Sequence, residues 1–194
     1  MKLSTKEIQS LYEQYRTPKN VIEHMIRVAE FAKELAEKLI KKGHKIDLEK
    51  LEKAALLHDL LRVCDFRELE LSKLTQRVTS VDIKAWIQQR KLFGKMGHTK
   101  AAHKILKELG HTKIAELILK HDFKAIDELQ TWEEKILYYA DKRVDGGKKV
   151  SLRKRFKSGK KRNSKPGDNA NKIKELEKKV YALEKELKKA TKAL

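Results

Sequence analysis

Histidine and aspartate residues occur in this sequence at positions where the surrounding pattern buries them. His58 and Asp59 are adjacent within the most hydrophobic stretch, Ala-Ala-Leu-Leu-His-Asp-Leu-Leu at 54–61. Asp141 follows Ile-Leu-Tyr-Tyr-Ala, and His24 has valines three residues before it and four residues after it. Because burying an unpaired carboxylate is costly, such aspartates need a cation or a network of donors. Inward imidazoles and carboxylates from different helices are how helical bundles build metal sites.

Each of these residues has an ordinary explanation when it is taken alone. A single inward histidine is more often a core residue that bonds a backbone carbonyl, and a single helical aspartate is usually an N-cap or an exposed charge. Four such residues in similar apolar surroundings are harder to explain separately. We therefore predict that His24, His58, Asp59 and Asp141 together bind a divalent metal ion.

Hydrophobic periodicity and capping residues predict the helices that must position this site. Capping boxes open at Ser4 and Thr131, Thr17-Pro18 begins the second helix, and Asp47 caps the third, which is expected to continue through Leu61. The expected helices lie at about 4–16, 18–42, 47–61, around 86, 98–109, 112–121 and 131–141. Period-two alternation long enough for a strand is absent, so the sequence predicts an all-α bundle with short loops.

The C-terminal part of the chain differs from the body in composition. We expect one domain over residues 1–160, a polar linker over 161–170 and an amphipathic helix over 171–194. Apolar residues in the last segment follow a strict heptad seam, formed by Ile173, Leu176, Val180, Leu183, Leu187, Ala190 and Leu194. Such a narrow seam requires a partner, either the twin helix of a homodimer or the body of the same chain.

Most of the formal net charge of +19 belongs to this C-terminal part, because residues 146–194 carry +13. Residues 148–165 hold ten basic residues and no acidic one. Such a field attracts phosphate-bearing partners, and nucleic acid is one candidate. Aromatic residues that could stack on bases are sparse there, namely Phe156 and Tyr181. A helix that packs on the body and turns a basic face to solvent explains the same pattern.

The order His24, then His58-Asp59, then Asp141 resembles the HD superfamily of metal-dependent phosphohydrolases, whose signature is H…HD…D on an all-α core. The local contexts are similar as well, with Val-Ile-Glu-His-Met-Ile-Arg-Val-Ala, Ala-Ala-Leu-Leu-His-Asp-Leu-Leu-Arg and Ile-Leu-Tyr-Tyr-Ala-Asp-Lys-Arg-Val around the three positions. The resemblance covers about residues 17–160. It implies an HD-domain helical bundle with phosphohydrolase activity.

Some HD proteins have two further histidines that carry a second metal, and His98 and His121 match that pattern. The chain resembles most closely the HD proteins that hydrolyse diadenosine tetraphosphate and the HD-GYP type, although it lacks the GYP segment, so hydrolysis of cyclic di-GMP is not favoured. His103 is an alternative to His98, but at five residues' distance it points elsewhere on the helix. The resemblance therefore implies one or two ions, and imidazole ligands suit Fe, Mn, Co, Ni or Zn.

The resemblance also implies roles for residues around the metal. Asp59 is expected to act in catalysis as a ligand, bridging if two ions bind, that orients the attacking water. Arg62 stands where the family often has lysine, and arginine can clamp a phosphate bidentately. Lys142 and Arg143 are further candidates to hold the substrate phosphate, unless they are exposed residues beside Asp141.

Other classes of chemistry find little support in the sequence. Cys64 is the only cysteine and lacks the context of an activated thiol, and a Gly-rich phosphate loop is absent. The chain shows neither a signal peptide nor an apolar run that would span a membrane, so we expect a cytoplasmic protein without a membrane partner. The expected substrate is a small phosphorylated molecule, with a nucleotide as the first choice. A non-catalytic module that binds metal or a nucleotide for regulation is the remaining alternative.

Overall fold

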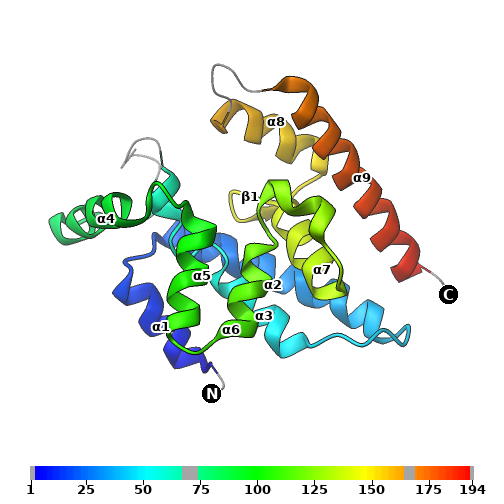
Figure 1. Ribbon diagram of the computed structural model, residues 1–194, viewed down its shortest axis with the longest axis horizontal. Helices are drawn as coiled ribbons and strands as arrows, with labels where there is room; N and C mark the ends of the chain where they lie inside the picture. The colour runs from blue at the N-terminus through cyan, green and yellow to red at the C-terminus, as the bar shows by residue number, and fades with distance from the viewer. Residues whose placement is uncertain (1–2, 67–73, 164–168, 193–194) are drawn as a thin grey trace.

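The protein is described here from a computed structural model, which covers residues 3–66, 74–163 and 169–192. The elements are α1 (Thr5–Gln14), α2 (Lys19–Ile40), α3 (Leu48–Leu57), η1 (Arg62–Asp65), α4 (Ser80–Phe93), α5 (His98–Glu108), α6 (Thr112–Leu119), η3 (Phe123–Glu128), α7 (Trp132–Asp141), β1 (Val144–Asp145), β2 (Lys148–Lys149), α8 (Leu152–Asn163) and α9 (Ala170–Lys192) (Figure 1). Helices dominate, which confirms the predicted all-α class.

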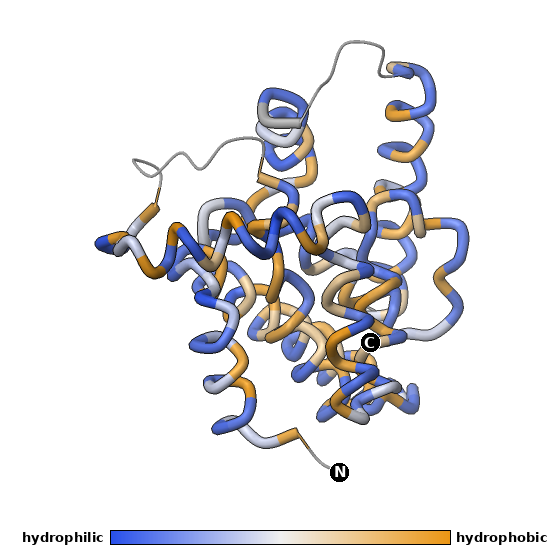
Figure 2. Tube along the Cα trace, turned by 60° about the vertical axis from the view of Figure 1, so that its left-hand side comes forward, coloured by the Kyte–Doolittle hydropathy of each residue, from blue (hydrophilic) through white to orange (hydrophobic). Residues whose placement is uncertain are grey.

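The long helix α2 forms the centre of the body. It packs against α3 along much of its length and also contacts α7, while α5 and α6 pair with each other and α6 packs on α3. Hydrophobic and hydrophilic residues are interspersed along the helices (Figure 2), as expected where helices turn one side to a shared core. Large side chains such as Met25, Leu51, Ile118 and Tyr138 are fully buried there.

Most of the predicted helix starts are confirmed. Capping boxes are present at Ser4 and Thr131, and the Asp47 side chain accepts a hydrogen bond from the backbone of the third helix. The second helix differs slightly, because Pro18 rather than Thr17 occupies the N-cap position. The Thr17 hydroxyl instead donates a hydrogen bond to the Leu60 carbonyl, so it ties the start of α2 to the chain beyond α3.

The third helix is shorter than predicted, since α3 ends at Leu57 and not near Leu61. Beyond it, Leu60 N–H donates to Leu57 O and Arg62 N–H donates to Asp59 O, which is the tighter three-residue spacing that leads into η1. The imidazole of His58 contributes to this change by bonding the Ala55 carbonyl, an acceptor that a continuing α-helix would use. The His-Asp doublet therefore lies at a helix end.

A short antiparallel ribbon follows α7, although the sequence predicts no strand. Strand β1 pairs with β2, with Val144 opposite Lys149. Gly146 and Gly147 form the two-residue turn, and both have positive φ, at 56° and 70°. Glycine adopts this backbone region without the steric penalty of a Cβ, so the pair is suited to a tight hairpin. The ribbon reverses the chain and delivers it to α8.

The heptad helix folds back on the body of its own chain. Helix α9 contacts α7, η3 and α2, and it runs beside α7 in Figure 1. The seam residues Leu176, Val180, Leu183 and Leu187 are buried in these contacts. Of the predicted linker at 161–170, residues 161–163 extend α8, and residues 164–168 lie outside the described residues, as does Leu194. Within the described ranges, every helix is too short or too polar to cross a bilayer.

Candidate metal centre

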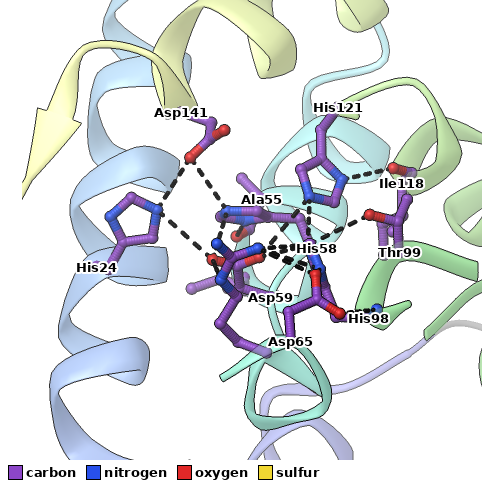
Figure 3. Close-up of polar contacts among 12 residues, drawn as sticks. His24, Ala55, His58, Asp59, Asp65, His98, Thr99, Ile118, His121 and Asp141 are labelled. Atoms are coloured by element: carbon purple, nitrogen blue, oxygen red, sulfur yellow. Dashed lines mark hydrogen bonds and ion pairs between the residues drawn. The ribbon is translucent and has the colours of Figure 1, made fainter. Parts of the chain in front are cut away.

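Six candidate metal ligands converge from five helices, and most lie at helix ends (Figure 3). His24 projects from the second turn of α2, while His58 is the C-cap of α3 and Asp59 follows it. The remaining three are His98 at the first position of α5, His121 just after α6 and Asp141 at the last position of α7. The structure thus brings together all six residues for which the sequence predicts a metal-binding role.

The carboxylate of Asp59 lies between two groups of imidazoles. Its Oδ2 atom is 3.9 Å from Nε2 of His24 and 3.8 Å from Nε2 of His58. Its Oδ1 atom is 3.0 Å from Nε2 of His98 and 3.7 Å from Nε2 of His121, and these two nitrogens lie 3.2 Å apart. One oxygen therefore faces each group, which is the arrangement that a bridging carboxylate requires.

Asp141 completes the first group. Its Oδ1 atom is 3.1 Å from Nε2 of His24 and 3.7 Å from Nε2 of His58. The ligand atoms of His24, His58 and Asp141 lie within 4.8 Å of one another, as do those of His58, Asp59 and His121. Nitrogen and carboxylate donors gathered at this spacing are suited to a divalent transition metal.

Backbone carbonyls fix the tautomers of the two most buried histidines. Nδ1 of His58 donates to the Ala55 carbonyl at 2.8 Å, and Nδ1 of His121 donates to the Ile118 carbonyl at 2.6 Å. Each bond leaves Nε2 with a free lone pair directed at the carboxylates. Nε2 of His58 is buried and has no hydrogen-bond partner within the described part of the chain. A metal ion would satisfy this otherwise costly nitrogen, so the donor set fits the cofactor.

Asp65 orients His98 and was not among the residues predicted from the sequence. Its Oδ2 atom accepts from Nδ1 of His98 at 2.5 Å, and its Oδ1 atom accepts from the His98 backbone N–H at 3.0 Å. Gly97 makes this approach possible, because its φ of +83° turns the chain into α5 at a conformation that favours glycine. A carboxylate behind a ligating histidine fixes the tautomer and raises the basicity of the ligand.

The charges within the site hold its carboxylates ionised. Burial by itself would raise the pKa of Asp59, but the Arg62 guanidinium and the neighbouring imidazoles outweigh it and keep that pKa well below its usual range. Burial acts on Asp141 in the same way, and Lys142 is the largest influence that reverses it and lowers the pKa. Burial lowers the pKa of His121 to about 4, so this imidazole is neutral at pH 7 and free to bind a metal.

The three predicted phosphate-binding residues lie in different surroundings. Arg62 stands at the edge of the site, 32% exposed, with its guanidinium 3.9 Å from Asp59 and 3.6 Å from Asp65. Lys142 is buried behind Asp141, and its Nζ donates to Oδ2 of that residue and to the His121 carbonyl. Arg143 makes its side-chain contacts elsewhere, with Val150 and Glu184.

The contacts of Arg143 join α7 to later parts of the chain. Its Nε donates to the Val150 carbonyl, and its Nη1 donates to Glu184 of α9 at 2.9 Å. The structure therefore does not bring Arg143 into the site. It also separates His103 from the ligands, since Nε2 of that histidine lies 3.0 Å from Oε1 of Glu116 at the surface.

Comparison with protein families agrees with this geometry. The family model described as HD domain matches residues 21–144, a span that contains all six candidate ligands. Comparison with curated proteins and with solved structures returns no match. HD domains typically bind divalent metals, and the grouped histidines and aspartates supply suitable donors. Because the matched span exceeds half of the chain, this protein belongs to the HD domain family.

Proposed function

We propose that this protein holds two divalent transition-metal ions and hydrolyses a phosphate ester or phosphoanhydride, with a nucleotide as substrate. The observation that carries the proposal is the position of Asp59, whose two oxygens face His24 and His58 on one side and His98 and His121 on the other. When bound, such ions lower the pKa of a water molecule and neutralise charge on the phosphoryl oxygens.

The residues around the ligands have distinct tasks in this proposal. Asp59 remains ionised and orients the attacking water from between the two groups of imidazoles. Lys142 neutralises one oxygen of Asp141 at 2.6 Å and fixes its carboxylate. Arg62 is the cation at the exposed edge, where its planar guanidinium suits a phosphoryl oxygen pair. The floor of the site is shielded from bulk solvent, since His58 is fully buried and His121 is 4% exposed, which strengthens the electrostatic interactions inside it.

The choice of two ions and of a nucleotide rests on different support. Both His98 and His121 lie beside Asp59, which supports the two-ion form that some HD proteins use. The nucleotide is supported by the resemblance to HD proteins that hydrolyse diadenosine tetraphosphate. Among metals, the imidazole-rich donor set favours Fe, Mn, Co, Ni or Zn over Mg.

Metal analysis together with a phosphate-release screen tests the proposal. The purified protein is assayed with nucleotides, dinucleoside polyphosphates and cyclic nucleotides, before and after chelation and with each metal added back. We expect two ions per chain and a phosphate release that chelation and Asp59→Ala both abolish. Asp127→Ala is the matched control, because Asp127 is an exposed carboxylate whose partner is Lys179.

Two results would contradict the proposal in different ways. A protein that neither retains nor rebinds a transition metal has no centre of the proposed kind. A protein that binds the ions but releases phosphate from none of the substrates is a metal-binding module without turnover, which is the regulatory alternative considered from the sequence.

A further inference from the structure

Arg155 reaches the metal centre from α8, outside the span that matches the HD family. Its Nη2 atom lies 4.0 Å from Oδ1 of Asp141, and its side chain is 20% exposed. Its Nε–H is buried and has no hydrogen-bond partner in the part of the chain that the structure describes. A buried donor without an acceptor carries a desolvation cost that a bound anion would relieve.

Contacts of neighbouring residues hold α8 in place and so set the position of Arg155. The Arg155 guanidinium itself is not part of these contacts. Val150 N–H donates to the Arg143 carbonyl at 2.7 Å, which anchors the start of α8, and Leu152 is 2% exposed. The ring of Phe156 lies between those of Phe123 and Tyr181, with centroids 6.2 and 5.7 Å away. The backbone of α8 is therefore held against the body, and the arginine head group is free to serve a ligand.

Neutralising Asp141 does not require Arg155. Oδ2 of Asp141 already accepts from Lys142 at 2.6 Å, and Oδ1 lies 3.1 Å from Nε2 of His24. The contact of Arg155 with the same carboxylate is long, at 4.0 Å. A guanidinium has five N–H donors in a planar fork, and this weak contact leaves most of them for another partner.

The charges around the ligands indicate what that partner is. Among the described ion pairs of the ligands and of Asp65, the carboxylates of Asp59, Asp65 and Asp141 lie near the cations Arg62, Lys142 and Arg155. Any divalent ion bound by these ligands adds positive charge to the site. This excess of positive charge favours a substrate with several negative charges, and Arg155 offers a second cationic position for one of them, apart from Arg62.

We propose that Arg155 binds a second phosphate group of the substrate, beside the one that reacts, so that α8 forms one wall of the substrate site. This inference rests on the proposed hydrolase function and narrows its substrate class to compounds with at least two phosphates in succession. Arginine is suited to the task because its fork matches two phosphate oxygens. In this arrangement Arg62 serves the reacting group and Arg155 the neighbouring one.

The test compares Arg155→Ala and Arg155→Lys with the matched control Arg153→Ala, which removes an exposed arginine from the same helix. The readout besides nucleotide hydrolysis is the binding of inorganic pyrophosphate and of inorganic phosphate to manganese-loaded protein, measured by calorimetry, with phosphate release monitored in the same samples. Metal content and the melting temperature of each variant are measured on the same samples.

We expect Arg155→Ala to weaken pyrophosphate binding about 10-fold or more, as for loss of a charged hydrogen-bond pair, with metal content unchanged. Phosphate binding changes less, Arg155→Lys is intermediate, and Arg153→Ala behaves as wild type. With active enzyme, the same variant raises KM for a nucleoside diphosphate more than for a monoester.

Equal pyrophosphate affinity in Arg155→Ala and wild type would overturn the inference. It would also be overturned if Arg155→Ala and Arg155→Lys lost metal in step with pyrophosphate binding, because Arg155 would then act as a positioning residue for Asp141. Failure of the proposed function is seen separately, in wild-type protein that binds no metal or releases no phosphate.

Discussion

Replacing Asp65 by asparagine should weaken one metal position and spare the other. The asparagine carbonyl can still accept from the His98 backbone N–H, as Oδ1 of Asp65 does at 3.0 Å. Its amide group, however, replaces the oxygen that lies 2.5 Å from Nδ1 of His98, so that a donor faces a donor. The imidazole then loses its support or carries its proton on Nε2, the atom that faces Asp59 at 3.0 Å. A protonated Nε2 cannot bind a metal.

The expected loss follows from the usual effect of such supporting carboxylates. Their removal weakens metal binding by about 10- to 100-fold, or about 1.4–2.7 kcal/mol. The loss should fall on the position formed by Asp59, His98 and His121, because His24, His58 and Asp141 have no contact with Asp65 among those described. Competition with a chromogenic chelator, titrated with Zn²⁺ or Mn²⁺, resolves the two affinities.

Glu116→Gln is the matched control for this experiment. It alters another carboxylate–imidazole pair, in which Oε1 of Glu116 lies 3.0 Å from Nε2 of His103, at a surface position apart from the ligands. Metal affinity should not change in this variant. Two ions bound by folded Asp65→Asn with wild-type affinities would refute the reasoning. An equal loss of metal affinity at both metal positions would show that Asp65 acts through the fold and not through His98.

Three further predictions concern stability and protonation. Leu187→Ala should lower the free energy of unfolding by about 2–5 kcal/mol in urea melts, because Leu187 lies on the inner face of α9 and is 1% exposed. A smaller change would mean that α9 is loosely docked. Burial by itself would raise the pKa of Glu184. The hydrogen bond from Tyr139, together with Lys188 and Arg143, outweighs burial and holds that pKa below the usual 4.5. The stabilisation by Glu184 is therefore present above about pH 4.5 and is lost as the pH falls through the lower pKa of the folded state. Glu184→Gln should have a lower melting temperature than wild type at pH 7, and the two melting temperatures should converge in acid. Nitrogen NMR of metal-free protein should find His121 neutral at pH 6 with its proton on Nδ1, which donates to the Ile118 carbonyl, whereas an imidazolium at that pH would contradict its pKa of about 4.

The sequence was sufficient to predict the all-α class, most helix starts and the six candidate ligands that meet between the helices. Apolar neighbours at three- and four-residue steps turn His24 and His121 inward, and the same periodicity buries Asp141 at the end of α7. Capping side chains such as Asp47 act within a few residues of their own positions, so they too can be recognised from local sequence. These features depend on short-range patterns.

Asp65 and Arg155 could not be predicted because their roles depend on contacts between distant segments. Asp65 lies in a stretch without clear periodicity, and it reaches His98 through the turn of η1 and the positive φ of Gly97. Arg155 lies in a run of basic residues that resembles a solvated face, and its approach to Asp141 requires the glycine turn between β1 and β2. Neither the contact of Asp65 with His98 nor that of Arg155 with Asp141 can be inferred from the neighbouring sequence.

Lys142 and Arg143 show how far adjacent residues can differ in role at a helix end. Helix α7 ends at Asp141, Lys142 is its C-cap, and the chain turns at Arg143 toward β1. Lys142 therefore reaches Asp141 and the His121 carbonyl, while Arg143 reaches Glu184 and the Val150 carbonyl. The C-terminal end of α7 thus joins the metal centre to the docking site of α9.

This junction changes how substitutions near Asp141 should be interpreted. Removing the charge of Arg143 breaks its hydrogen bond to Glu184, so we expect it to act first on the docking of α9. Removing the charge of Lys142 leaves a buried carboxylate oxygen without its donor, which acts on metal affinity directly. A loss of activity at either position therefore does not by itself identify a phosphate-binding residue. Among the described cations around the ligands, Arg62 and Arg155 are therefore the residues whose substitution we expect to test substrate binding most directly.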